Sequence, residues 1–119
     1  MALRVIIHRR AQWDLDEYVA WLSKHAPVTT AAWFARLEAH ILGLAEKGPA
    51  CLPAAESRRT ALDLRESRFG KRPNVFRLLF YLEQDAVHVV RVRRAQRRLL
   101  TRKEIQEAVD GGGEGNAEE

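Results

Sequence analysis

Five arginines near the C-terminal end of the sequence are the residues most able to do chemistry. The stretch VHVVRVRRAQRR, residues 87–98, begins with valines that suit a strand, and it then carries Arg91, Arg93, Arg94, Arg97 and Arg98. An arginine side chain is a planar, permanently charged fork that can hold two oxygens of a phosphate at once. Because a core strand needs no such charge, the pattern predicts a surface that binds phosphate or RNA.

Arg77 is the single residue for which a functional role is easiest to argue. It interrupts the apolar segment VFRLLFYLE, residues 75–83, where a charge is costly without a purpose. Arginines fixed on a sheet can stabilise the charge of a phosphoryl-transfer transition state, but their pKa, above about 12, makes them poor general bases. The nearest acid or base candidates on the same predicted face are Asp63 and Tyr81. The alternative for Asp63 is a cross-strand salt bridge to an arginine.

Several other kinds of chemistry are not indicated by the sequence. It has no Gly-rich phosphate loop, its four histidines lack a metal-ligand spacing, and Cys51 is its one cysteine. We therefore expect no cofactor and no metal. A lone cysteine is typical of a reducing cytoplasm, and no stretch approaches the roughly 18 apolar residues of a membrane span. These features predict a cytoplasmic protein that does not contact the membrane.

Charge is distributed unevenly along the 119 residues. Residues 58–103 hold 14 Lys/Arg and 4 Asp/Glu, whereas residues 104–119 hold six acidic residues and no Lys or Arg. A basic block of this kind usually meets phosphate or an acidic protein. The alternative is that it only reflects the arginine-rich surfaces common in genomes of high GC content.

Two helices should follow a short N-terminal strand at residues 3–7. In residues 8–27, apolar side chains recur at helical spacing, and Pro27 ends that helix. A second helix runs from about Thr29 or Thr30 to Gly48, with only a short connection between the two. We therefore expect an antiparallel helical hairpin.

Three strands and one short helix should complete a single domain over residues 1–109. Strands are predicted at 61–67, 75–83 and 87–92, a helix at 102–109, and a disordered acidic tail at 110–119. The expected fold class is α+β, in which the N-terminal strand and the helical hairpin pack on one face of a small, mostly antiparallel four-stranded sheet.

Alternation along the strands predicts what each face of the sheet carries. One face should pack against the hairpin through Phe76, Leu78, Phe80 and Leu82, which should meet Leu15, Val19, Leu37 and Ile41. Nothing is expected to cover the other face. By alternation, that bare face carries Arg65, Arg77, Arg91 and Arg93.

The segment LDLRESRFGKRPNVFRLLFYLEQDAVHVVRVRRAQRR, residues 62–98, resembles the C-terminal half of the RelE/ParE toxins of type II toxin–antitoxin modules. It has a strand with a basic residue, a loop, an aromatic–Arg pair that opens a long strand, and a hairpin strand that ends in a basic cluster. The N-terminal strand and helical hairpin are similar in order, so the resemblance covers roughly residues 3–100.

The resemblance implies a toxin that a partner antitoxin holds inactive. RelE-like members cut mRNA in the ribosomal A site, whereas ParE-like members poison DNA gyrase and are not nucleases. By position, Arg65 and Arg77 match basic residues of the RelE-like site, and the one after the last strand falls on Arg93, Arg94 or Arg97. The RelE-type tyrosine near the C-terminus has no counterpart, because Leu99 and Leu100 stand there.

Three functions remain open at this point. We favour a ribosome-dependent endoribonuclease, in which Arg65, Arg77 and Arg94 are catalytic, Asp63 or Tyr81 is the acid or base, and RNA or phosphate is bound by Arg91, Arg93, Arg97 and Arg98. The alternative is a gyrase inhibitor without nuclease activity, which the missing catalytic groups favour. The third is a plain RNA-binding module, for which exposed aromatic side chains should stack on bases.

Overall fold

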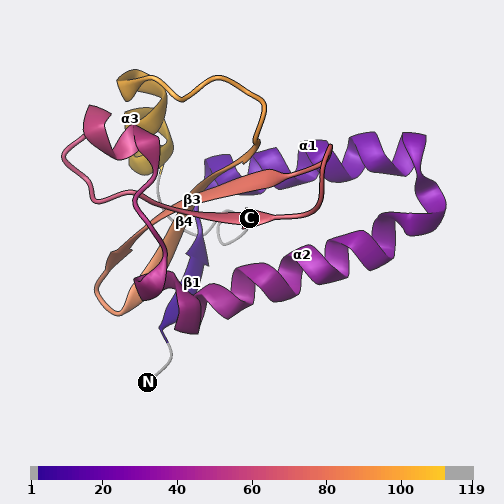
Figure 1. Cartoon of the computed structure of the whole chain (residues 1–119), viewed down its shortest axis with the longest axis horizontal. Coiled ribbons are helices and arrows are strands. Elements are labelled where there is room, and N and C mark those ends of the chain that lie inside the picture. Colours follow the sequence, from indigo (N-terminus) through magenta and orange to yellow (C-terminus); the bar gives the residue numbers. More distant parts are fainter. Residues whose placement is uncertain (1–2, 112–119) are drawn as a thin grey trace.

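The computed structural model describes residues 3–111, which form a mixed four-stranded sheet with helices on both of its faces (Figure 1). The strands are β1 (Arg4–Ile7), β2 (Arg65–Phe69), β3 (Phe76–Glu83) and β4 (Ala86–Arg94). The helices are α1 (Arg9–His25), α2 (Pro27–Lys47) and α3 (Arg102–Gly111), with the short 3-10 helices η1 (Gly48–Ala50) and η2 (Ala55–Arg59). The predicted α+β fold class is confirmed.

The sheet has the strand order β1-β4-β3-β2. Strands β2, β3 and β4 are antiparallel neighbours, whereas β1 lies parallel to β4. The parallel pair arises because the whole helical hairpin and two further strands separate β1 from β4 along the chain. Strand β2 begins at Arg65, later than predicted, and α3 extends to Gly111. The predicted disordered tail lies, from residue 112 onward, outside the described residues.

The helical hairpin covers one face of the sheet, as predicted. Helix α1 ends at His25, and Pro27 occupies the first turn of α2, where its missing N–H costs nothing. The core on this face joins Leu15, Leu37 and Ile41 of the helices to Phe76, Leu78 and Phe80 of β3, with Leu82 packed at its margin. Val19 is half-buried and lies outside this cluster.

The prediction that the second face of the sheet is bare is wrong. A second core on that face joins side chains of β3 and β4 to the segment around η2 and to α3; its buried members are Ala54, Leu64, Leu79, Tyr81, Val90, Leu100, Ile105 and Ala108. The physical reason is that the second face is itself apolar at several positions, so it needs a cover. Helix α3 and the loop before β2 provide it.

A β-bulge changes which face the residues of β4 occupy. Phe80 pairs with Val89 and Leu79 pairs with Arg91, so Val90 has no partner residue on β3. As a result, Val87 and Val89 pack in the first core before the bulge, whereas Val92 does so after it, so the residues of β4 that face this core change from odd to even numbers. The bulge interrupts simple alternation just before the arginine cluster.

Candidate functional site

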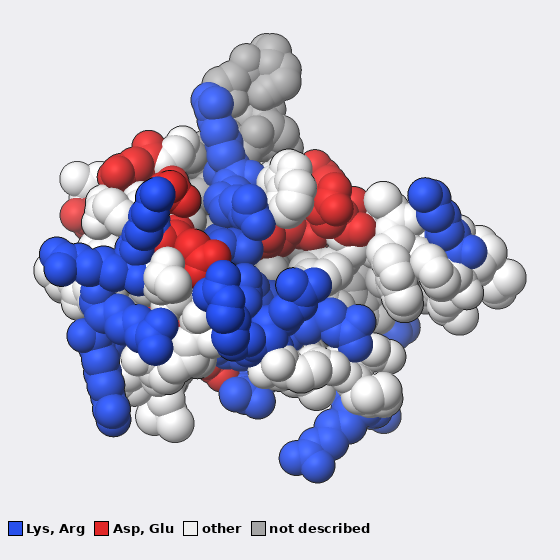
Figure 2. Space-filling view, turned by 90° about the horizontal axis from the view of Figure 1, so that it is seen from above, with Lys and Arg blue, Asp and Glu red and all other residues white. Residues whose placement is uncertain are grey.

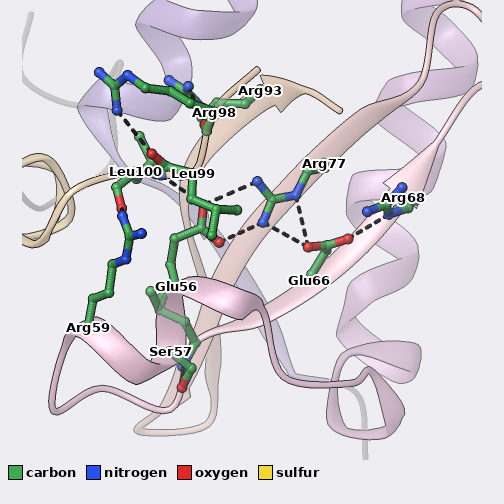
Figure 3. A network of polar contacts seen from close by, with 11 residues as sticks. Glu56, Ser57, Arg59, Glu66, Arg68, Arg77, Arg93, Arg98, Leu99 and Leu100 are labelled. Atoms are coloured by element: carbon green, nitrogen blue, oxygen red, sulfur yellow. Dashed lines mark hydrogen bonds and ion pairs between the residues drawn. The ribbon is translucent and has the colours of Figure 1, made fainter. Parts of the chain in front are cut away.

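Arg77, the predicted catalytic arginine, lies buried in a network of carboxylates beneath the cover of the second face (Figure 3). Its Nη1 and Nη2 donate to the two oxygens of Glu56 at 3.1 and 2.6 Å. Its Nε donates to Glu66 Oε1 at 2.9 Å. Only 3% of Arg77 is exposed, and Glu56 is completely buried. The prediction that the Arg77 side chain stands outside the core is therefore wrong.

The same network ties together four parts of the chain. Glu56 lies in η2, Glu66 on β2 and Arg77 on β3. The fourth part is the connection before α3, where the backbone N–H of Leu100 donates to Glu56 Oε2 at 3.0 Å. Burial would raise the pKa of Glu56, but hydrogen bonds from Arg77 and Leu100 hold that pKa below its usual value. Both partners therefore stay charged, and two carboxylates neutralise the guanidinium.

The other residues predicted to act with Arg77 are engaged as well, although the buried Nε of Arg65 has no hydrogen-bond partner among the described residues. Arg65 donates through Nη1 to the carbonyls of Pro49 and Cys51, and its Nη2 lies 3.1 Å from Asp63 Oδ2. Asp63 thus forms a salt bridge to an arginine, but its partner is Arg65, two residues further along the same segment, and not a residue across the strand as the alternative expected.

Tyr81, the second acid or base candidate, is buried and stacks on His88 with ring centroids 4.7 Å apart. Burial, together with the nearby Glu83, raises the pKa of its hydroxyl above the usual value. A hydroxyl with a raised pKa stays protonated at neutral pH, so Tyr81 is a poor general base.

A large open groove lies between the helical hairpin and the edge of the sheet where β2 ends, β3 begins and β4 ends. Its volume is about 1110 Å³. Seven of its lining residues are Lys or Arg and two are acidic; the basic ones are Arg10, Arg36, Lys71, Arg91, Arg93, Arg94 and Arg97. Figure 2 shows a broad band of Lys and Arg side chains across one face of the molecule, with the acidic side chains mostly gathered to one side of it.

Aromatic side chains form much of the same groove. All three tryptophans of the sequence line it, together with Tyr18, Phe69 and Phe76. Trp13 and Trp21 are about half exposed, at 51% and 50%. The guanidinium of Arg10 lies 4.2 Å from the centre of the Trp13 ring. The groove therefore combines exposed apolar surface with positive charge.

The arginine cluster divides between the groove and local structural contacts. Arg91 is buried and pairs with Asp14 at 2.8 Å, and Asp14 also accepts from the backbone N–H of Val92. Arg94 donates to Asn74 at 2.9 Å, and Arg97 is exposed. Arg98 pairs with Glu104 at 2.8 Å and does not line the groove.

Arg93 differs from the other two buried arginines of the described residues. It is 8% exposed and lines the groove, yet no carboxylate within residues 3–111 pairs with it. Its Nη2 donates to the carbonyl of Arg98 at 2.8 Å, and its buried Nε has no hydrogen-bond partner among these residues. Arg93 is thus a buried cation whose counter-charge is missing.

Sequence reasoning missed the tryptophans and Glu56. A weak signal existed for the first group, because Trp13 and Trp21 lie two helical turns apart on the polar side of α1. Glu56 lies in a loop segment, PACLPAAESRRT, whose pattern predicts no burial. No local signal could have paired it with Arg77, which is 21 residues away.

Comparison with known proteins gives one result that bears on the site. A family model described as the ParE toxin of the type II toxin–antitoxin system parDE matches residues 5–99. The matched range includes the helical hairpin, β2, β3, β4, all of β1 except Arg4, and every arginine of the cluster. No curated protein matches the chain. Among the described residues, no helix is long and apolar enough to cross a membrane.

Proposed function

This chain belongs to the ParE toxin family of type II toxin–antitoxin systems, and we propose that it arrests growth by binding DNA gyrase rather than by cutting RNA. The observation that carries this proposal is the state of Arg77. A guanidinium that grips a scissile phosphate must have free donors facing the substrate. The Nε, Nη1 and Nη2 atoms of Arg77 donate to Glu56 and Glu66 instead.

The surroundings of Arg77 add to this proposal. Two carboxylates next to a phosphate-binding arginine would repel a phosphate, because like charges in a buried site cost free energy. The predicted acid and base candidates, Asp63 and Tyr81, are engaged by Arg65 and His88. A toxin that only binds a protein target needs none of these groups to be free.

The antitoxin partner that the family implies should cover the basic groove. A segment that fits must be amphipathic: acidic side chains would meet the arginines, and apolar side chains would pack on the half-exposed Trp13 and Trp21. Segments of this kind commonly fold as they bind. Masking the groove would then hold the toxin inactive.

A second candidate function, ribosome-dependent mRNA cleavage, is favoured by one observation. Arg94 and Arg97 lie in a groove that also presents tryptophans, and arginines beside exposed aromatic rings suit single-stranded RNA. The catalytic group would then lie in the groove and not at Arg77.

Expression of the chain without its antitoxin separates the two functions. Plasmid topology and primer extension on abundant mRNAs are read from the same culture after induction. The gyrase proposal predicts relaxed plasmid or cleaved DNA before any mRNA is cut. Early mRNA cleavage at defined codons with plasmid supercoiling unchanged would refute it and support the second candidate.

A further inference from the structure

Arg93 carries a charge that the rest of the described chain does not balance. Arg77 and Arg91, the other buried arginines, each face a carboxylate at 2.6 to 2.8 Å. Glu104, whose charge acts on Arg93, is itself bonded to Arg98. An arginine cannot shed its proton at physiological pH. The isolated chain therefore holds an uncompensated cation at the edge of the groove, which is unfavourable.

We propose that Arg93 is the receptor for a single carboxylate that the antitoxin inserts into the groove. This inference rests on the proposal that the antitoxin covers the groove, and it names the contact that anchors it. The buried Nε of Arg93 lacks a partner, and its Nη2 is engaged only by the neutral carbonyl of Arg98. A carboxylate would supply both the missing acceptor and the missing charge.

The charged neighbours of Arg93 also favour the binding of an anion there. Burial lowers the pKa of Arg93 below its usual value, Arg91 and Arg98 lower it further, and Glu104 and Tyr18 act in the opposite direction. Positive neighbours therefore outweigh negative ones close to the guanidinium. Arg91 and Arg98 are themselves paired with Asp14 and Glu104, so Arg93 is the cation of this group that is left without a carboxylate among the described residues.

A protein carboxylate fits this place better than a nucleic acid. Tyr18, Trp33 and Phe76 form an aromatic cluster in the groove, with the Tyr18 and Phe76 ring centroids 4.8 Å apart. Asp14 and Glu17 also line the groove, and they interrupt any continuous positive track for a phosphate backbone. One acidic residue among apolar ones satisfies both the arginine and the aromatic surface.

Two variants of the full chain test this inference against its cognate antitoxin. Arg93→Met should weaken antitoxin binding about 10- to 100-fold, since a charge-assisted hydrogen bond is lost. The matched control Arg97→Gln removes the same charge from an exposed groove residue and should weaken binding less than about fivefold. Equal effects of the two substitutions would overturn the inference.

Thermal unfolding of the free chain separates a receptor from a structural arginine. Arg93→Met should raise the Tm of the free chain, because it removes an unbalanced buried charge. If Arg93 served only to hold the carbonyl of Arg98, the substitution would lower the Tm, and that result would contradict the inference.

The wild-type chain provides a test that needs no substitution. In ¹⁵N NMR spectra, the Nε–H signal of Arg93 should move downfield when the antitoxin is added and should stay in place with a 12-nucleotide single-stranded RNA. A response to the RNA alone would assign the site to nucleic acid and overturn the inference. Failure to inhibit gyrase while Arg93 still responds to the antitoxin would refute the proposed target only. Gyrase inhibition with an unresponsive Arg93 would refute this inference only.

Discussion

Glu56 and Arg77 form an ion pair in which both side chains are buried. Glu56 also accepts the N–H of Leu100, so one carboxylate holds a β3 side chain and the connection to α3 together (Figure 3). A pair of this kind adds little net stability relative to apolar residues, but the loss of one partner leaves the other charge buried and alone. At the scale of single residues, Arg77 is therefore a structural residue first.

Replacing Arg77 with alanine should destabilise the fold. We expect a loss of about 3–5 kcal/mol in the free energy of unfolding, because Glu56 and Glu66 would remain without their partner. Arg97→Ala, on an exposed arginine, should change it by no more than about 0.5 kcal/mol. Urea unfolding followed by circular dichroism measures both. An Arg77→Ala protein as stable as the wild type would show that the network is dispensable and would reopen a surface role for Arg77.

Buried His8 should make the stability depend on pH. Its Nε2 lies 3.0 Å from Nδ1 of His88, and burial, followed by the nearby His88, lowers the pKa of His8 below 6.5. The unfolded chain then binds more protons than the folded one just below that pH, so stability is full above about pH 6.5 and falls as the pH drops. The pKa of the half-buried His40 is lowered as well, which acts in the same direction.

Urea midpoints between pH 7.5 and 5.5 measure this dependence. The pKa of Glu56 lies below its usual 4.5. The stability that Glu56 contributes to the fold is therefore lost only at a pH below the range of these measurements. His8→Gln should flatten the dependence, whereas His25→Gln, on an exposed histidine, should leave it unchanged. Stability that increases toward pH 5.5 would contradict the assignment.

Helix α3 acts as a cover for the second face of the sheet. It is short, and it packs Ile105 and Ala108 onto Leu79, Tyr81 and Val90. An isolated helix of this length is marginal in water, so it depends on that apolar contact. The segment that carries η2 lies beside α3, at the upper left of Figure 1, and completes the cover.

A substitution inside α3 tests whether this cover is part of the core. Ile105 is almost completely buried, so Ile105→Ala should cost about 2–5 kcal/mol in the free energy of unfolding. Leu99→Ala is the control, since Leu99 lies just before α3 and is exposed. A cost of Ile105→Ala below about 0.5 kcal/mol, measured by urea unfolding, would mean that the second face is effectively bare.

On the scale of the whole molecule, the intrinsic tryptophan fluorescence should report antitoxin binding in the groove. All three tryptophans line it, and Trp13 and Trp21 are half exposed. Antitoxin binding should therefore shift the tryptophan emission to shorter wavelength and reduce its quenching by acrylamide. Trp13→Phe with Trp21→Phe should remove most of that change. Tight antitoxin binding with unchanged emission would place the partner on another surface.

The order of elements and the first core could be predicted from the sequence because they depend on local periodicity. Phe76, Leu78 and Phe80 alternate as a strand should, and the helices repeat apolar residues on one side. The faces of β4 could not be predicted, since the bulge at Val90 adds one residue to one strand only.

The candidate site was harder to predict than the fold. An isolated arginine in an apolar strand signals either a functional charge or a buried ion pair, and only the position of Glu56 decides between them. Glu56 reaches Arg77 through tertiary folding. The groove likewise needs α1, α2 and the end of β4 to meet, which no single segment of the sequence reveals.

Purified components give the strictest test of whether the chain inhibits DNA gyrase. Gyrase is assayed for supercoiling of relaxed plasmid while the concentration of the wild-type chain is raised, with and without its antitoxin. The chain should inhibit supercoiling or trap cleaved DNA, and stoichiometric antitoxin should reverse the effect. The contradicting result is full gyrase activity at a concentration of the chain that cleaves mRNA in a translation extract.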